Sequence, residues 1–476
     1  MSRNILFVTS QMYPFVTGTM GIFNYSLPKK LAELGWDARV IVPRIRNVHR
    51  DYPEITEEVA QLFLPMGERL IACRVVSCLV DSVTVYLIDA PDYFDRPNLY
   101  GYEDEAERFG LFCKAVLAAL PLLAFKPQLL HLQDWHTGLI PMLMETKHAG
   151  DPFYEDIQTL LTIHNLGYQG IFDRDYAALL DLQWEDWVDS GAAYYDQINF
   201  MKAGILHADA ITTVSPSYAK EIATKQYGST LEEAIQSRSE HLFGVLCGLD
   251  LQINDPSTDS RLHVTYDADT LERKAMNKAA LQQALGFPIR AEIPVLSLFS
   301  RLKTEKGLDL VVNAMDDLMR MDVQFVIVSN GDDIYEDFFR EAALRYPDRF
   351  AFVLYDNDFA YQAYAGSDMF LMPSGYEPCG IGQLIALRYG AVPIVRQVGG
   401  LSDSIQPFDE QTGEGNGFVF KPYFAKVMLY TIRKAIEAFH RPDSWRTVVQ
   451  NGMREDHSWN KYTKQYADVY ERVLNR

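Results

Sequence analysis

The chain has 476 residues, of which 48% are hydrophobic, enough to bury two cores of about two hundred residues each. Its formal net charge of −20 would repel phosphate backbones and anionic lipids, which argues against nucleic acid and membrane surfaces as partners. The five cysteines include no close Cys-x-x-Cys pair, so neither a disulfide framework nor a zinc site is indicated.

The first forty residues predict a strand, a helix and a second strand, which is how a Rossmann-type domain opens. The strands are residues 4–10 and 37–43, and the helix is residues 24–35. The connecting loop holds Gly18 and Gly21, too few glycines for a dinucleotide-binding motif, so by itself it is an ordinary turn. No basic region or cleavage site precedes the first strand, and no apolar run reaches about eighteen residues. We therefore expect a soluble, cytoplasmic protein.

Polar residues follow two later strands of this half. The strand before Asp134-Trp135-His136 precedes a helix, and the strand LLTI runs into His164-Asn165. Asp134 can cap the helix or contact a ligand, and residue type alone does not decide between these roles. A single histidine at a strand end is usually structural.

A second Rossmann-like pattern of strands and helices begins at Pro294, after a linker-like run from Pro256 to Ser260. Arg301 and Lys306 lie on the loop after its first strand. The stretch 372–404 then reads as strand, turn, helix, strand and loop. Glu377 precedes a helix expected to start near Gly380 and to end on Gly390 as a left-handed cap. A helix start and glycines at the carboxyl edge of a parallel sheet suit a phosphorylated ligand, although a glutamate there is more often a cap.

The stretch 372–404 resembles the signature of bacterial glycogen synthases and plant starch synthases, which are retaining glucosyltransferases. It supplies, in order, Glu377-Pro378-Cys379-Gly380, Gln383, Tyr389-Gly390, Val395-Arg396, Gly399-Gly400-Leu401 and Asp403. The blocks DWHTG (134–138), LLTIHNLGYQGIF (160–172) and SRL with KGLDL (300–310) are similar to further family blocks. The resemblance covers nearly the whole chain, from Asn4 to the last helix.

The resemblance implies an α/β protein with the GT-B fold, two Rossmann-like domains with a cleft between them. We expect the domains at residues 1–244 and 245–456, and a helix in 457–476 that crosses back to the first domain.

A sugar that leaves a nucleotide leaves negative charge on the diphosphate, and fixed cations or a metal must stabilise it. The sequence shows no carboxylate cluster with metal-site spacing, so we expect no metal and no cofactor. By resemblance, Arg301 and Lys306 hold the donor phosphates, Glu377 stabilises the transferred glucose, and His164 lies beside that sugar. The substrate-binding residues implied in the same way are Gly18, Asp134, Asn165, Gly380, Ile381, Gly382 and Gln383. The partners are a nucleotide sugar, with ADP-glucose favoured over UDP-glucose, and an α-glucan acceptor.

The chain departs from the family pattern mainly near this expected site. The family's Lys-Thr-Gly-Gly-Leu loop is here Thr17-Gly18-Thr19-Met20-Gly21-Ile22: the lysine is missing, Thr19 replaces a glycine and Ile22 an aspartate. The other replacements are Cys247 for asparagine, Asn254 for tryptophan, Ser329 for glycine, Tyr361 for histidine, Gly375 for arginine and Gly382 for threonine. Two functions therefore stay open: a glucosyltransferase that extends an α-1,4-glucan, and a glucan-binding or regulatory relative with weak or no transfer.

Overall fold

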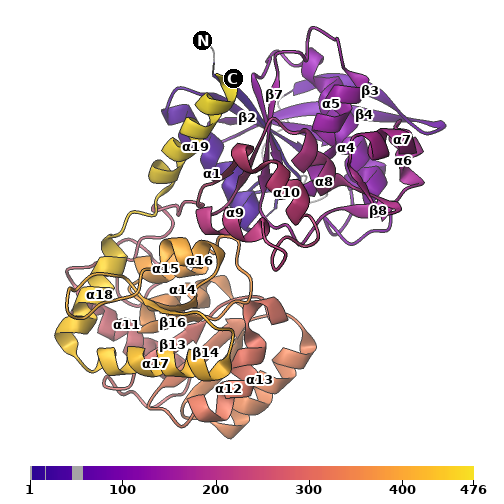
Figure 1. The fold of residues 1–476 in the computed structure, drawn as a ribbon. Helices are drawn as coiled ribbons and strands as arrows, with labels where there is room; N and C mark the ends of the chain where they lie inside the picture. Colours follow the sequence, from indigo (N-terminus) through magenta and orange to yellow (C-terminus); the bar gives the residue numbers. More distant parts are fainter. Residues whose placement is uncertain (1–2, 17, 46–56, 476) are drawn as a thin grey trace. The chain divides into compact units, whose positions relative to one another are not determined.

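A computed structural model describes residues 3–16, 18–45 and 57–475. The chain forms two compact units, the first made of Met1–Gly248 with Trp459–Arg476 and the second of Leu249–Ser458 (Figure 1). Among the described residues, no helix is both long and apolar enough to cross a membrane.

A nine-stranded sheet forms the centre of the first unit. Its strands, in spatial order, are β12 (Leu242–Gly244), β11 (Ala210–Thr213), β7 (Gln158–Ile163), β6 (Leu129–Gln133), β1 (Asn4–Val8), β2 (Asp37–Pro43), β5 (Val83–Asp89), β4 (Arg69–Val80) and β3 (Glu57–Met66). The strands from β12 to β5 are parallel, and the hairpin of β4 and β3 adds an antiparallel edge. Every residue of β6 is buried, including the polar side chains of His131 and Gln133, as expected for a central strand that is covered on both faces.

Helices and a small second sheet surround this centre. The helices are α1 (Thr19–Glu33), α3 (Pro91–Phe94), α4 (Glu105–Ala119), α5 (Leu139–Lys147), α6 (Tyr176–Leu179), α7 (Trp184–Asp189), α8 (Phe200–His207), α9 (Pro216–Ile222), α10 (Glu232–Ser237) and α19 (Trp459–Leu474). The small antiparallel sheet has the order β8 (Ile171–Asp173), β10 (Gln197–Asn199), β9 (Ala193–Tyr194).

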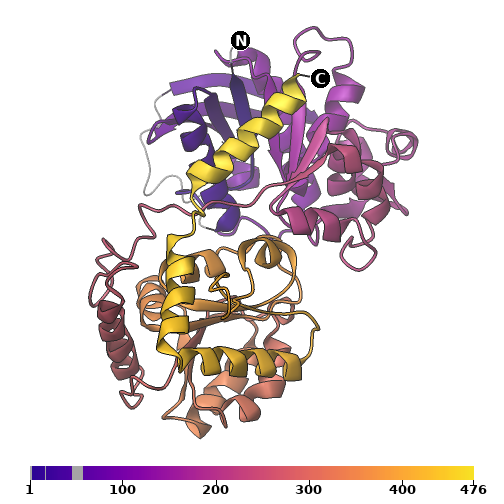
Figure 2. The same cartoon turned by 60° about the vertical axis from the view of Figure 1, so that its left-hand side comes forward.

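The terminal helix α19 lies against α1, as Figures 1 and 2 show. Phe23 of α1 meets the rings of Trp459 and Tyr466 edge-on, with centroids 5.6 and 5.5 Å apart. The Tyr470 hydroxyl hydrogen-bonds His131 Nδ1 in the sheet at 3.0 Å. The last helix is therefore part of the first unit's core.

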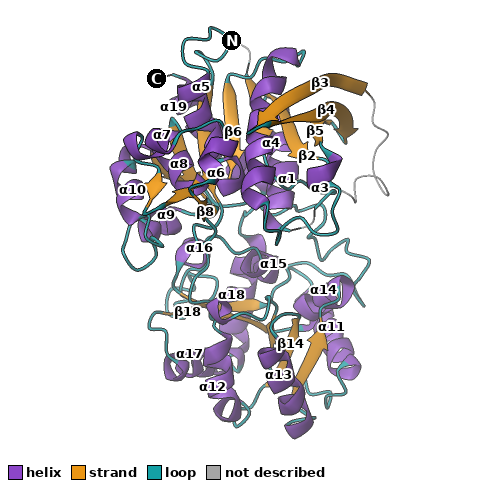
Figure 3. Ribbon diagram, turned by 90° about the vertical axis from the view of Figure 1, so that its right-hand side faces the viewer, coloured by secondary structure: helices purple, strands orange, loops and turns teal. Residues whose placement is uncertain are grey.

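The second unit is a parallel six-stranded sheet with helices on both faces (Figure 3). Its strands, in spatial order, are β15 (Phe350–Leu354), β14 (Gln324–Ser329), β13 (Val295–Leu298), β16 (Met369–Met372), β17 (Val392–Arg396) and β18 (Phe418–Phe420). Its helices are α11 (Leu271–Ala284), α12 (Leu308–Leu318), α13 (Asp333–Arg345), α14 (Asn357–Gly366), α15 (Gly382–Arg388), α16 (Gly399–Ser404), α17 (Ala425–Phe439) and α18 (Pro442–Arg454). Successive side chains of β14 point to opposite faces of the sheet. Phe325 packs with α12, α13 and α17 on one face, and Val326 packs with α11 and α14 on the other.

The structure places two expected helices differently. The helix expected from residue 24 already begins at Thr19, directly after Gly18. The helix expected near Gly380 begins at Gly382 and has seven residues, because Gly380 has a φ of +72° that no α-helix accommodates. Its end is as predicted, since Gly390 has a φ of +66° and donates to the Leu387 carbonyl.

Candidate active site

Two loops meet at the carboxyl edge of the second unit's sheet, one after β13 and one after β16. Gly307 of the first loop has a φ of +77°, and a Cβ there would lie 2.2 Å from the Pro373 carbonyl oxygen. The Gly375 N–H of the second loop donates to the Glu305 carbonyl at 2.9 Å. This close backbone approach brings the first loop, which carries Arg301 and Lys306, against the second loop, which carries Glu377.

Lys306 and Glu377 form an ion pair across these loops, with 2.7 Å between Nζ and Oε2. The Ser374 hydroxyl donates a second hydrogen bond to the same carboxylate oxygen, at 3.1 Å. Glu377 is only 6% exposed, and these two partners replace the hydrogen bonds to water that its carboxylate loses on burial. Arg301, on the same loop as Lys306, is exposed, and its guanidinium pairs with no residue that the structure describes. It is therefore available to bind an anion.

The backbone after Glu377 offers further donors. The N–H groups of Gly380, Ile381 and Gly382 donate to no acceptor in the described part of the chain. The left-handed conformation of Gly380 makes this open arrangement possible. Consecutive unpaired N–H groups beside two cations form a site suited to anionic oxygens.

A glycine pair supports this loop from behind. A Cβ on Gly399 would lie 2.0 Å from the Glu377 carbonyl oxygen, and one on Gly400 would lie 2.1 Å from that of Cys379. The Gly400 N–H also donates to the Glu377 carbonyl at 3.1 Å. The two glycines therefore set the position of the Glu377 loop.

Gln383 contributes an unused acceptor to the same loop. Its Nε2 donates to the carbonyls of Cys379 and Gly380, at 3.0 and 2.9 Å, and to the Ser404 hydroxyl at 3.1 Å. Its Oε1 is buried and has no partner in the described structure. A ligand hydroxyl at this place would satisfy it.

In the first unit, Asp134 connects the ends of two neighbouring strands. Its Oδ1 accepts the N–H groups of His164 at 2.7 Å and Asn165 at 3.4 Å, and its side chain caps no helix. Asp134 has a φ of +54°, which an L-residue rarely adopts. Burial raises the pKa of Asp134 to about 7, although the two backbone hydrogen bonds act in the opposite direction.

The His164 ring is fixed in place and uncharged. Its Nε2 lies 2.7 Å from Gln133 Oε1, and the Phe23 ring meets it edge-on at 4.9 Å. Burial lowers the pKa of His164 to about 3, so the imidazole is neutral near pH 7. A neutral imidazole can exchange hydrogen bonds with a sugar hydroxyl without adding charge. The Asn165 amide oxygen accepts the Gly167 N–H at 2.9 Å, which shapes the loop after His164.

The first loop brings little charge to this end of the sheet. Gly18 has a φ of +136° and accepts the Ile22 N–H at 2.9 Å, while Thr17 lies outside the described residues. Ile22, at the family's aspartate position, is 37% exposed. Residues 10–22 contain no charged side chain.

The residues of the second unit that depart from the family pattern each contact a neighbouring residue. The sequence patterns did not indicate these contacts. The Ser329 hydroxyl donates to the Ser300 carbonyl, next to Arg301. The Tyr361 hydroxyl donates to Asn254 Oδ1 at 2.8 Å, so two departures contact each other.

Two glycine departures lie against aromatic rings. A Cβ on Gly375 would lie 3.2 Å from the Tyr423 ring. One on Gly382 would lie 3.2 Å from the Phe370 ring and 3.3 Å from the Tyr364 hydroxyl. Glycine at these positions leaves room for neighbouring rings.

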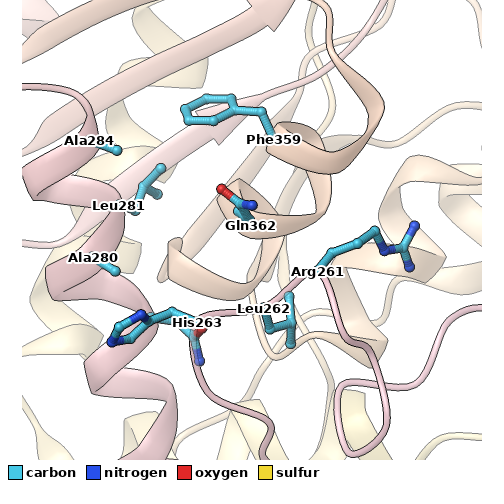
Figure 4. A pocket seen from close by; sticks show the side chains of 9 residues that line it. Arg261, Leu262, His263, Ala280, Leu281, Ala284, Phe359 and Gln362 are labelled. Carbon is cyan, nitrogen blue, oxygen red and sulfur yellow. The ribbon is translucent and has the colours of Figure 1, made fainter.

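A separate hollow lies between α11 and α14 (Figure 4) and contains none of the predicted site residues. Its walls include Leu281, Phe359 and Gln362, and the Arg261 guanidinium points away from it. Arg261 instead pairs with Asp259 at 2.7 Å and lies over the Tyr361 ring. The predicted site residues of the second unit lie on the loops of the sheet edge instead.

Two α/β units, each built on a mainly parallel sheet, are typical of the GT-B class of glycosyltransferases. The structure is similar to the catalytic domain of starch synthase IV from Arabidopsis thaliana bound to ADP and acarbose, with a TM-score of 0.89, 27% identity and 100% of both chains covered. In fold alone it is similar to sucrose-phosphate synthase from Thermosynechococcus elongatus, with a TM-score of 0.63, 17% identity and 99% of each chain covered.

Sequence comparison narrows the class to one family. Residues 4–237 match the model of the starch synthase catalytic domain, and residues 287–448 match that of glycosyl transferases group 1. Glycogen synthase of Clostridium novyi is 44% identical over 478 residues, covering 99% of this chain and 100% of the relative. Glycogen synthase of Desulforamulus reducens is 41% identical over 473 residues, covering 99% and 98%. The chain therefore belongs to the glycogen synthase and starch synthase family and is a glycosyltransferase, which confirms the predicted family and fold class.

Proposed function

We propose that the protein is a retaining glucosyltransferase that extends an α-1,4-glucan, with ADP-glucose as the favoured donor. The observation that carries this proposal is the Lys306–Glu377 ion pair beside the unpaired Arg301, at the carboxyl edge of the second unit's sheet. Cations there meet a departing diphosphate, and a carboxylate there stabilises a sugar that becomes positively charged. The glycogen synthases to which the chain is similar support the glucan as acceptor.

In the proposed reaction, the bond between the anomeric carbon and the diphosphate oxygen breaks, and its electron pair leaves with the diphosphate. Arg301 offers two parallel N–H donors to this charge, and Lys306 a single mobile one. The unpaired N–H groups of Gly380, Ile381 and Gly382 surround the same charge. Pre-aimed donors of this type are usually the largest catalytic contribution in transfer reactions.

The remaining predicted residues hold the sugar and the acceptor. Glu377 takes the positive charge that develops at the anomeric carbon, and Gln383 Oε1 accepts a ligand hydroxyl. His164, neutral and fixed by Gln133, hydrogen-bonds the transferred glucose. Asp134 and Asn165 shape the loop that presents His164.

Active transfer is favoured over a non-catalytic glucan-binding role because the departures in the second unit are matched by local contacts. Tyr361 pairs with Asn254, Ser329 with Ser300, and Gly382 makes room for Tyr364. A site that had lost its function would be under no constraint to keep such pairs together with the Lys306–Glu377 ion pair. The starch synthase IV structure is bound to ADP, which supports ADP as the nucleotide of the donor.

The test is the rate of ADP release from ADP-glucose with glycogen as acceptor, beside UDP release from UDP-glucose. We expect ADP release, an α-anomeric product by proton NMR, and an unchanged rate after treatment with a chelator. Activity that a chelator abolishes and magnesium restores would contradict the roles of Arg301 and Lys306. Glycogen binding without release of either nucleotide would support the non-catalytic role. The expected cytoplasmic location stays a prediction of the sequence.

A further inference from the structure

Gln133 ends β6 with a polar side chain that is fully buried. Its Nε2 lies 3.4 Å from the His131 carbonyl oxygen, and its Oε1 lies 2.7 Å from His164 Nε2. A backbone carbonyl can only accept a hydrogen bond, so the amide NH₂ group faces His131 and the amide oxygen faces the His164 ring. The reverse orientation of the amide would set two oxygens against each other.

This orientation of the amide decides which nitrogen of the His164 ring carries the proton. An amide oxygen can only accept, so His164 Nε2 must be the donor of the hydrogen bond to Gln133. Burial lowers the pKa of His164 to about 3, so the ring carries a single proton near pH 7. The proton is therefore on Nε2, and Nδ1 is an unprotonated acceptor.

The acceptor nitrogen Nδ1 of His164 is held in place but not enclosed. It hydrogen-bonds no residue that the structure describes, and it is not buried. The Phe23 ring packs edge-on against the imidazole at 4.9 Å, and the His164 backbone N–H donates to Asp134 Oδ1 at 2.7 Å. Backbone and ring are thus fixed by separate contacts, which gives Nδ1 the defined position that a ligand contact requires.

We propose that Gln133 is a positioning residue that fixes the tautomer of His164, so that Nδ1 accepts a hydrogen bond from a hydroxyl of the transferred sugar. The opposite tautomer would present an N–H at the same place and would reverse the direction of this hydrogen bond. Gln133 would therefore act on the sugar through His164, without touching it. The proposal rests on the proposed function, because it takes the sugar of the nucleotide donor as the ligand of His164.

The first test is spectroscopic and needs no ligand. In protein with isotope-labelled histidine, long-range proton–nitrogen NMR spectra distinguish protonated from unprotonated ring nitrogens, and the His164 signals are assigned by their absence in His164→Ala. We expect a single tautomer of His164 in the parent near pH 7, with the proton on Nε2. A proton on Nδ1, or on both ring nitrogens, would overturn the proposal.

The second test measures ADP release from ADP-glucose by Gln133→Met, which keeps the length of the side chain and removes the amide. We expect both tautomers of His164 in this variant and a value of kcat/KM about three- to tenfold lower, the effect of about one hydrogen bond. Thr162→Val is the matched control. It removes another buried hydroxyl of the same sheet, 2.6 Å from His131 Nε2, and should keep kcat/KM within about twofold.

The same change in a His164→Ala background separates a positioning role from a general effect on the sheet. If Gln133 acts only through His164, Gln133→Met should change kcat/KM of His164→Ala by less than about twofold. An equal loss in both backgrounds would overturn this proposal and leave the proposed function standing. A parent that releases neither ADP nor UDP in the presence of glycogen would overturn the proposed function, whereas the NMR spectra would still decide the tautomer.

Discussion

Removing the Lys306 side chain tests the centre of the proposed site. The Lys306→Ala variant deletes the cation that lies 2.7 Å from Glu377 and would meet the diphosphate. Deleting one pre-aimed donor of this kind costs about 3 to 4 kcal/mol in the transition state, or a factor of roughly 10² to 10³ in rate. The loss should appear mainly in kcat, because the departing charge is largest in the transition state.

The same change also affects folding, and its size follows from burial. Glu377 keeps the Ser374 hydrogen bond but loses its ion-pair partner at 6% exposure. Breaking a fully buried pair costs about 3 to 5 kcal/mol, but the Lys306 side chain is 24% exposed, so we expect about 1 to 3 kcal/mol. The thermal midpoint should then fall by several degrees, and the variant should remain folded at 25 °C.

The assay is the initial rate of ADP release with glycogen, beside thermal unfolding of each variant. Lys303→Ala is the matched control, because Lys303 lies on the same loop and makes no ion pair with a described residue. It should keep its rate within about twofold. A Lys306→Ala enzyme that is folded and retains a third of the parent rate would refute the role given to this cation.

Three further outcomes follow from the structure. Because the pKa of Asp134 is about 7 in the folded protein and about 4 in the unfolded chain, the parent has its full stability below about pH 4 and loses part of it as pH rises through about 7. Asparagine does not titrate, so the free energy of unfolding of Asp134→Asn, measured with denaturant, should rise by about 3 kcal/mol relative to the parent between pH 5 and pH 8. Gly307→Ala would place a Cβ 2.2 Å from a carbonyl oxygen of the neighbouring loop, and should lower the transfer rate at least about tenfold by separating the two loops. Inserting a lysine before Thr17 together with Thr19→Gly and Ile22→Asp should raise the transfer rate from ADP-glucose, because the first domain then supplies a phosphate-binding cation.

Each of these outcomes has a control or a contrary result. Gly286→Ala shares the positive φ of Gly307 but meets no atom within 4 Å, so it should be folded and fully active. If the free energies of unfolding of Asp134→Asn and the parent differ by the same amount at pH 5 and at pH 8, the Asp134 carboxyl is ionised throughout this range. An unchanged rate in the repaired loop would show that the second domain alone holds the donor.

The sequence by itself determined the elements and the family. Apolar periodicity located β2 residue for residue, because the strand carries its own hydrophobic pattern. The motif around Glu377 pointed to the glycogen synthase family, which the comparisons confirm. The individual site residues remain predictions, since their roles rest on the family resemblance and on local geometry.

Only the tertiary structure decided which of these residues touch. Lys306 and Glu377 are 71 positions apart, and Asp134 is 30 positions from the His164 N–H that it accepts. Such contacts depend on the order of strands in a sheet and on close backbone approach at Gly307, and no local pattern encodes either.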